Sequence, residues 1–248
     1  MQSETLILET NNLTKNFGEF RALDNLNLKI NQGEIFGFLG PNGAGKTTTI
    51  RLLMGMLVPT EGWAKIGGLD CHQNRVEAKR LVGYLPDNPT FYDYLKGEEI
   101  LRFVGQMHGL ERHELEQKIP VLLAQFSLTE ASQEFAVNYS AGMKRKLALA
   151  CALIHNPQLL LLDEPTTGLD PYASREVQNL ISSISQEGKT VFLSSHLLDM
   201  VEKLCHRVAI IDHGRLLTVG TPADLKASLC PGGSLEDAFF TVTREEPK

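Results

Sequence analysis

The segment 40–47 restricts the fold of this chain more than any other, because it matches the pattern G-x-x-x-x-G-K-[ST] in full. It lies between a short apolar run, 34–39, that we predict to be a buried strand, and a helical pattern over 47–56. The loop consists of Gly40, Pro41, Asn42, Gly43, Ala44, Gly45, Lys46 and Thr47, and Thr48 follows it. Because the glycines carry no side chain, backbone N–H groups can approach phosphate oxygens closely. A plain connecting turn is the alternative, but such a turn does not require Lys-Thr at its end.

The residue types at the end of this loop predict the kind of ligand that it binds. Lys46 would place a positive charge between the β- and γ-phosphates of a nucleotide, and the Thr47 hydroxyl would hold Mg²⁺. The N-terminus of the following helix contributes a further partial positive charge. We therefore expect a phosphate-binding loop with magnesium beside it.

A second apolar run, Leu159–Leu162, predicts a buried strand that ends in the carboxylates Asp163 and Glu164. Two adjacent carboxylates at that point are costly unless a cation compensates them. We assign Asp163 to Mg²⁺ and Glu164 to accepting a proton from an attacking water. Taken alone, the segment also fits a strand that meets a polar turn. Pro165 predicts an extended backbone conformation for Glu164.

A third strand, predicted at 191–193, is followed by Ser194, Ser195 and His196. In an open α/β sheet, ligands bind beyond the carboxyl ends of the strands. His196 would thus lie at the edge that carries Asp163, where its imidazole could hydrogen-bond a γ-phosphate oxygen. An incidental polar residue at a strand end is the alternative for a single histidine.

Strand and helix patterns alternate along most of the chain, which favours a mainly parallel sheet with helices on its faces. We expect further strands at 22–30, 82–85 and 208–211. Between about 88 and 150 the strand patterns stop and amphipathic helical patterns take over. We interpret that stretch as a helical lobe inserted into an α/β core.

The composition excludes several classes of protein. The 248 residues are 42% hydrophobic and 22% charged, values typical of globular proteins and not of disordered or collagen-like chains. No apolar run reaches the length that a membrane-spanning helix needs, and the first residues lack the pattern of a secretory signal. A formal charge of -6 without a basic run argues against DNA or RNA as a ligand. The four cysteines are widely spaced, which fits a reducing cytosol better than disulfides or a zinc site.

In this order, these segments resemble the nucleotide-binding subunit of an ABC (ATP-binding cassette) transporter. The segment Tyr139–Lys144 stands where that family has its LSGGQ signature. Ser140 and Gly142 match the signature, whereas Ala141 and Met143 depart from it. From the residues alone, Ser140 can also be the N-cap of the apolar helix that we predict from Leu147 to Ile154, and such a helix end is an anion site.

The resemblance implies roles for further residues. Ser140 and Gly142 would meet the γ-phosphate held by an opposite subunit, so that two copies enclose two ATP molecules. Phe17 stands where an aromatic ring stacks on adenine, and packing at a strand end is its alternative role. Thr167–Asp170 resembles the D-loop, with Asp170 at the dimer interface, and His196 resembles the switch histidine.

Asp87 is a clear departure from the family pattern. The segment Val82–Asp87 resembles the strand that leads to the Q-loop, but Asp87 replaces the usual Gln. A carboxylate can still bind Mg²⁺ and orient water, although it adds negative charge beside the γ-phosphate. Our hypothesis is that Asp87 is functional and makes metal binding more dependent on charge.

The resemblance extends from Leu6 to about Val242 and implies an α/β P-loop NTPase core with a mainly parallel sheet, an N-terminal antiparallel β region and an inserted helical subdomain. We predict one domain, with 1–87 and 151–230 as the core, 88–150 as the helical subdomain and 231–248 as a C-terminal tail.

The tail resembles that of exporter ATPase subunits. The resemblance therefore implies an ATPase, with ATP and Mg²⁺ as its cofactors, that energises a membrane exporter by closure of an ATP-bound dimer. Its partners would be separate transmembrane permease subunits and a second ATPase subunit, at the cytoplasmic face of the membrane. Two other functions stay open: an ABC ATPase without a membrane partner, and an ATP-gated interaction module with little hydrolysis.

Overall fold

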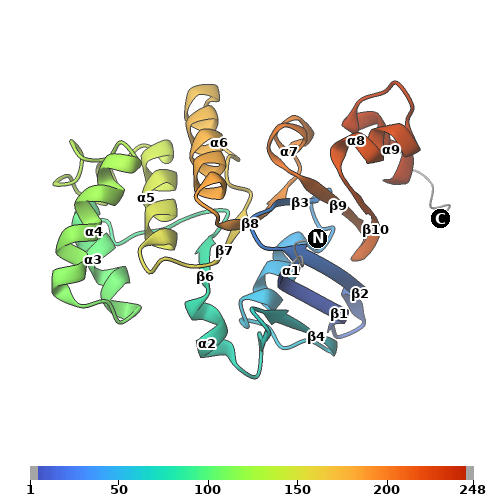
Figure 1. The fold of residues 1–248 in the computed structure, drawn as a ribbon, viewed down its shortest axis with the longest axis horizontal. Coiled ribbons are helices and arrows are strands. Elements are labelled where there is room, and N and C mark those ends of the chain that lie inside the picture. Colours follow the sequence, from blue (N-terminus) through green and yellow to red (C-terminus); the bar gives the residue numbers. More distant parts are fainter. Residues whose placement is uncertain (1–4, 244–248) are drawn as a thin grey trace.

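Two β-sheets and a set of covering helices form residues 5–243, the part of the chain that the structure, a computed structural model, describes (Figure 1). The strands are β1 (Leu6–Phe17), β2 (Phe20–Asn31), β3 (Ile35–Leu39), β4 (Glu61–Ile66), β5 (Leu69–Asp70), β6 (Val82–Leu85), β7 (Leu159–Asp163), β8 (Thr190–Ser195), β9 (Arg207–Asp212) and β10 (Arg215–Gly220). The helices are α1 (Lys46–Leu53), α2 (Arg75–Arg80), α3 (Gly97–Met107), α4 (Arg112–Gln125), the 3-10 turn η1 (Ala136–Asn138), α5 (Ala141–Leu153), α6 (Pro171–Gln186), α7 (Leu198–Leu204), α8 (Pro222–Leu229) and α9 (Leu235–Thr243).

The larger sheet has the strand order β10-β9-β3-β8-β7-β6. Every pair in it is parallel except β9 with β10, which are antiparallel neighbours at one edge. The smaller sheet, in the order β2-β1-β4-β5, is antiparallel throughout. The predicted mainly parallel sheet, the antiparallel N-terminal region and the expected strands are thus confirmed.

The apolar strands of the larger sheet separate two hydrophobic cores. In β7, Leu159 and Leu161 point into the core that contains α1 and the antiparallel sheet. Leu160 and Leu162 point the opposite way, into the core that contains α5, α6 and α7. This is the alternation that a strand buried on both faces requires, and it explains why β7 is a continuous leucine run.

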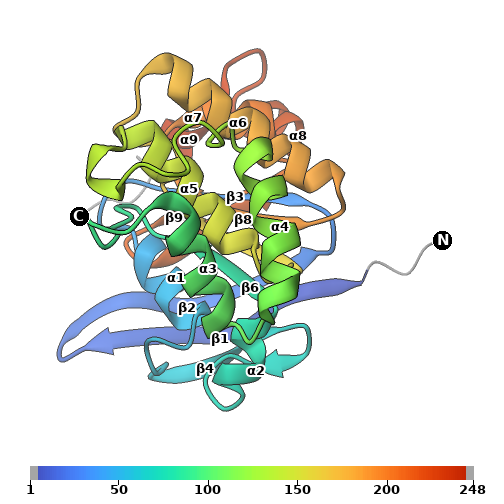
Figure 2. The same cartoon turned by 90° about the vertical axis from the view of Figure 1, so that its left-hand side faces the viewer.

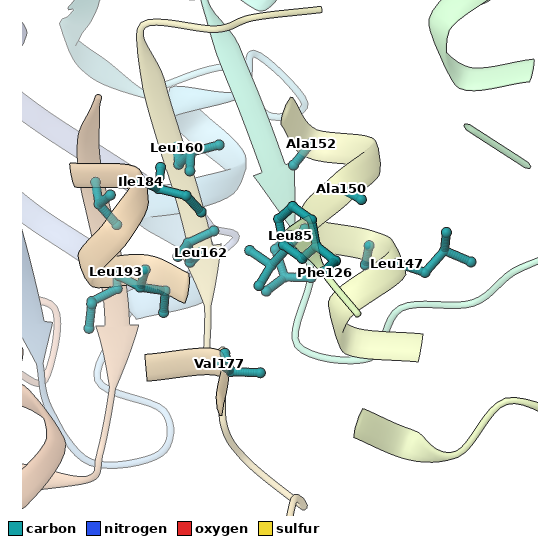
Figure 3. Packing of buried hydrophobic residues seen from close by; sticks show 14 of the residues in the cluster. Leu85, Phe126, Leu147, Ala150, Ala152, Leu160, Leu162, Val177, Ile184 and Leu193 are labelled. Atoms are coloured by element: carbon teal, nitrogen blue, oxygen red, sulfur yellow. The ribbon is translucent and has the colours of Figure 1, made fainter. Parts of the chain in front are cut away.

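The helices α3, α4 and α5 form the lobe that the helical pattern over 88–150 predicts (Figures 1 and 2). Helix α5 joins this lobe to the larger sheet, because it packs against β6 so closely that a Cβ on Gly83 would lie 2.1 Å from the Ala152 carbonyl oxygen. Figure 3 shows Leu147, Ala150 and Ala152 of this helix beside Leu85 of β6. The position of the signature segment is therefore fixed by the core of the sheet.

Most of the described part of the predicted tail is the helix α9, Leu235–Thr243. Helix α9 packs on α7, α8 and β10, with Leu235 and Ala238 fully buried. Residues 244–248 of the predicted tail lie outside the described residues.

Candidate active site

The loop 40–47 connects β3 to α1 and owes its shape to glycines that serve two different purposes. Gly43 and Gly45 adopt the left-handed conformation, with φ of 83° and 104°. Gly40 is required by packing, because a Cβ there would lie 2.3 Å from the carbonyl oxygen of Ile211. The loop is therefore held against β9 while its backbone curves around an open centre.

Lys46 begins α1, and its side chain folds back over the loop. The residue is only 6% exposed, and its ammonium donates hydrogen bonds to the carbonyl oxygens of Gly40 at 2.7 Å and Pro41 at 3.2 Å. The same ammonium lies 3.3 Å from Oε1 of Glu164. The structure thus brings the predicted lysine and the predicted general base into one ion pair.

Glu164 follows β7 in a backbone conformation that the sequence did not predict. Its φ is 47°, in the left-handed region, so the extended conformation predicted from Pro165 is wrong. The cause is the neighbouring strand: the Glu164 N–H lies 3.2 Å from both the carbonyl oxygen and the hydroxyl of Ser194 and donates to them. The turn closes with a bond from the Thr167 N–H to the Glu164 carbonyl oxygen at 3.2 Å.

The two carboxylate oxygens of Glu164 have different surroundings. Oε2 accepts a hydrogen bond from the Thr167 hydroxyl at 3.1 Å and lies 2.9 Å from Nδ1 of His196. Oε1 is buried and lacks a hydrogen-bond donor, although Lys46 is within ion-pair distance. A buried acceptor without a donor is costly, so this oxygen is suited to bind a proton-bearing ligand atom such as water.

Asp163 is the last residue of β7 and is 1% exposed. Burial raises the pKa of this carboxyl, and hydrogen bonds from the hydroxyls of Ser194 and Thr47 lower it in part. The negative charges of Asp87 and Glu164 raise the pKa further. A cation would relieve this concentration of negative charge.

These residues fit Mg²⁺ in the way expected for a site that binds it with a substrate. Magnesium is usually held by one or two carboxylates, a hydroxyl and phosphate oxygens, not by a complete protein cage. Thr47 and Asp163 supply the hydroxyl and a carboxylate in direct contact with each other. Residues 5–243 contain no cluster of three or more His, Cys, Asp or Glu side chains that could hold a metal ion.

A cavity of about 300 Å³ lies over the loop and collects most of the predicted residues. It is lined by Phe20, Ala22, Pro41, Asn42, Gly43, Gly45, Lys46, Thr47, Thr48, Asp87 and Glu164. Asp87 thus reaches the same space as the loop and Glu164, the predicted general base. Phe20 was not predicted, and the only signal for it was an aromatic residue close to Phe17 on the facing strand.

The remaining predicted residues lie outside this cavity lining. Phe17 is 48% exposed at the end of β1, and the Lys15 ammonium lies 5.1 Å from its ring centre. Ser140 caps α5, as predicted, by accepting a hydrogen bond from the Met143 N–H at 3.2 Å. The helix begins at Ala141, well ahead of the apolar run.

Asp170 caps α6, because its Oδ1 accepts hydrogen bonds from the N–H groups of Tyr172 at 2.9 Å and Ala173 at 3.0 Å. The N-termini of α5 and α6 are adjacent, since a Cβ on Gly142 would lie 3.0 Å from that of Ala173. The signature segment and the Asp170 turn therefore share one exposed surface, apart from the cavity lining.

Comparison with known proteins gives one consistent family. Residues 23–167 match the family model described as ABC transporter. The chain is 38% identical over 246 residues, or 98% of its length, to the Escherichia coli protein named "Probable multidrug ABC transporter ATP-binding protein YbhF", and it spans 42% of that relative. It is 41% identical over 212 residues to the "Bacitracin transport ATP-binding protein BcrA" of Bacillus licheniformis. This match covers 85% of the chain and 68% of that relative.

A solved structure described as "Structure of ATP binding subunit of ABC transporter" superposes with a TM-score of 0.87. Its sequence is 31% identical, and the match covers 96% of this chain and 99% of that structure. The P-loop architecture of the two chains is therefore the same over nearly their whole length.

Proposed function

The chain belongs to the ABC transporter family, and from this membership and the geometry of the cavity we propose that it hydrolyses ATP to energise a membrane exporter. The single observation that carries the proposal is the position of Glu164. Glu164 lines the cavity over the loop, and its unsatisfied Oε1 lies 3.3 Å from the Lys46 ammonium.

In the proposed reaction, water attacks the γ-phosphorus of ATP and the bond to the departing ADP oxygen breaks. Glu164 accepts the proton of that water, while His196 holds the other carboxylate oxygen in place at 2.9 Å. Lys46 exchanges its bonds to loop carbonyls for bonds to the β- and γ-phosphates. Bound Mg²⁺, held by Thr47 and Asp163 with Asp87 close by, would neutralise developing charge.

A second copy of this chain, or a related chain, is the proposed partner across the nucleotide. Ser140 and Asp170 are exposed on the surface formed by the N-termini of α5 and α6. The N-terminus of α5 offers N–H groups to an anion. They lie outside the lining of the nucleotide cavity in the same chain. Opposing copies would thus supply to each other the γ-phosphate contacts that one copy lacks.

The membrane partner is proposed to bind an apolar groove between the helical lobe and the larger sheet. This groove has a volume of about 290 Å³, and Pro86, Phe91, Tyr92 and Phe103 are among its lining residues. Tyr92 is 70% exposed and offers a large aromatic surface at this groove. Another lining residue, Pro86, directly precedes Asp87 in the sequence. None of the helices in residues 5–243 is long and apolar enough to cross a membrane. A separate permease, with this chain on its cytoplasmic face, completes the proposal.

The proposal is tested by phosphate release from the purified chain beside size-exclusion mass with and without ATP. Removing a general base typically costs about 10²–10⁴ in rate, so Glu164→Gln should bind ATP, form a stable dimer and release almost no phosphate. Glu116→Gln, on the exposed face of α4, is the control and should behave as the wild type. If Glu164→Gln retains wild-type phosphate release, the assignment of the base is refuted. If the wild type binds ATP but releases no phosphate with or without permease, the ATP-gated module replaces the ATPase.

A further inference from the structure

Arg145 is a buried cation in α5 that the proposed chemistry does not use. The residue is 5% exposed, although its neighbours Lys144 and Lys146 lie nearer the surface. Its Nη1 donates hydrogen bonds to the carbonyl oxygens of Pro86 at 3.1 Å and Asp87 at 2.7 Å. Its Nη2 donates to the carbonyl oxygen of Thr167 at 3.1 Å. The guanidinium thus bonds to main-chain oxygens of two segments that are distant in sequence.

Each of these two segments leads to a different functional part of the molecule. The segment of Pro86 and Asp87 runs from β6 into the groove proposed for the permease, and Asp87 lines the nucleotide cavity. Thr167 closes the turn after the general base, because its hydroxyl donates to Glu164 Oε2 at 3.1 Å and its N–H donates to the Glu164 carbonyl oxygen at 3.2 Å. Arg145 therefore touches the groove side and the catalytic turn at the same time.

We propose that Arg145 is a positioning residue that holds the Asp87 segment and the Glu164 turn in fixed relation, so that a displacement in the groove moves the general base. We call this three-bond connection the clamp. Its effect on the general base rests on the proposed function, whereas the clamp itself rests on the three hydrogen bonds. Arginine suits the role because its planar guanidinium presents several N–H donors in a rigid fork. Lysine at this position would keep the charge, but a single ammonium could not span the two segments.

The charges around Arg145 support a charged guanidinium in this buried place. Burial lowers its pKa, and three carboxylates of the active site raise it again. These carboxylates are Asp87, Asp163 and Glu164. The positive charge of Arg145 offsets part of their mutual repulsion, which favours the carboxylate arrangement seen in the cavity.

Hydrogen exchange measured by mass spectrometry on the full chain tests the clamp directly. In Arg145→Lys, amides in peptides covering 84–92 and 164–169 should exchange about tenfold faster, in both segments together. The turnover number for phosphate release should fall about tenfold, while the Kd for a trinitrophenyl analogue of ATP changes less than about threefold. Arg145→Gln, which removes the buried charge as well as the guanidinium fork, is measured beside it and should release both segments in the same way. Arg112→Lys, the same change on the exposed face of α4, is the control and should alter none of these values.

The outcomes separate a clamp from a structural role and from failure of the proposed function. Faster exchange in only one of the two segments, or in α5 alone, would overturn the proposal, because a clamp must release both segments at once. Faster exchange in both segments with unchanged turnover would overturn the positioning role. If the wild type releases no phosphate, the proposed function fails, and the exchange data still decide whether Arg145 joins the two segments.

Discussion

Acidification should destabilise this chain through His155, which follows the C-terminus of α5 and lies outside the active site. Nε2 of His155 lies 3.0 Å from the carbonyl oxygen of Val82, so the neutral ring carries its hydrogen on Nε2. Nδ1 is buried and has no hydrogen-bond partner. The ring of His108 stacks on it with centres 3.7 Å apart and an interplanar angle of 5°. A proton added to Nδ1 would therefore be buried without an acceptor.

The direction of the effect follows from the pKa of His155. This pKa is lowered from 6.5 to about 4, mainly by burial. Repulsion from His108, Lys118 and Lys189 contributes to the lowering, and the hydrogen bond to Val82 opposes it. Between these two values the unfolded chain binds a proton that the folded chain does not. The contribution of neutral His155 to the free energy of unfolding is therefore complete above pH 6.5 and is lost as the pH falls through this window.

A shift of that size would correspond to about 3 kcal/mol, and because part of the ring is accessible to solvent we expect about 1–2 kcal/mol. For a domain of this size, that is a fall in thermal midpoint of about 2–8 °C.

The assay is the thermal midpoint at pH 7.5 and pH 4.5, compared between the wild type and His155→Gln. The glutamine amide can still donate to Val82 but does not titrate, so the variant should lose less stability on acidification than the wild type. His72→Gln, at an exposed histidine, is the matched control and should follow the wild type. Equal acid losses in the wild type and His155→Gln would refute the reasoning, since other groups would then account for the whole effect.

Two further substitutions test the site. Ser194→Ala removes the hydroxyl that donates to Asp163 and receives the Glu164 N–H, so phosphate release should fall about tenfold and urea unfolding should show a loss of about 1–3 kcal/mol. Ser195→Ala removes a hydroxyl that accepts a hydrogen bond from the Leu197 N–H, away from both carboxylates, so it should cost less activity, and an equal loss would contradict the role of Ser194. Phe17→Ala should weaken binding of ATP and GTP about tenfold each in an equilibrium fluorescence titration, because stacking tolerates any base. A larger loss in Phe20→Ala would transfer that role to the ring that lines the cavity.

The sequence was most informative where a segment carries its own signal. The loop 40–47 requires a strand before it and a helix after it, and both are present. The run Leu159–Leu162 is flanked by polar residues, so its limits were readable, and β7 extends it by only one residue, Asp163. Such segments are buried on both faces or fixed by a motif, which leaves little freedom for the rest of the chain to alter them.

Of the antiparallel sheet, the residues alone indicated only the strand at 22–30, which is β2. β1 contains polar residues in place of a clear alternation, among them Asn11 and Asn12, and its register with β2 shifts several times. What makes it a strand is pairing on both sides, with β2 and β4. Such pairing depends on segments as far apart as Leu8 and Ile66, which a local pattern does not contain.

Arg145 shows the same limit at the active site. In the sequence it stands between two lysines and gives no local reason to be buried. Its burial depends on the carbonyl oxygens of Pro86 and Asp87, 59 and 58 residues earlier, and of Thr167, 22 residues later. Only the packing of α5 against the sheet brings these oxygens together. Charged residues that act through main-chain contacts are therefore the part of a site that sequence patterns miss most easily.

Glu164 shows how tertiary contacts can reverse a local preference. A residue before proline favours extended backbone, and a left-handed glutamate costs about 1–3 kcal/mol. That cost is opposed by bonds from the Glu164 N–H to Ser194 and by side-chain contacts with Lys46, Thr167 and His196. Because these contacts come from β8, α1 and the turn itself, no single segment encodes the conformation. It follows that the proposed general base holds its position only while all three parts are in register, and that loosening any one of them should reduce turnover before it unfolds the chain.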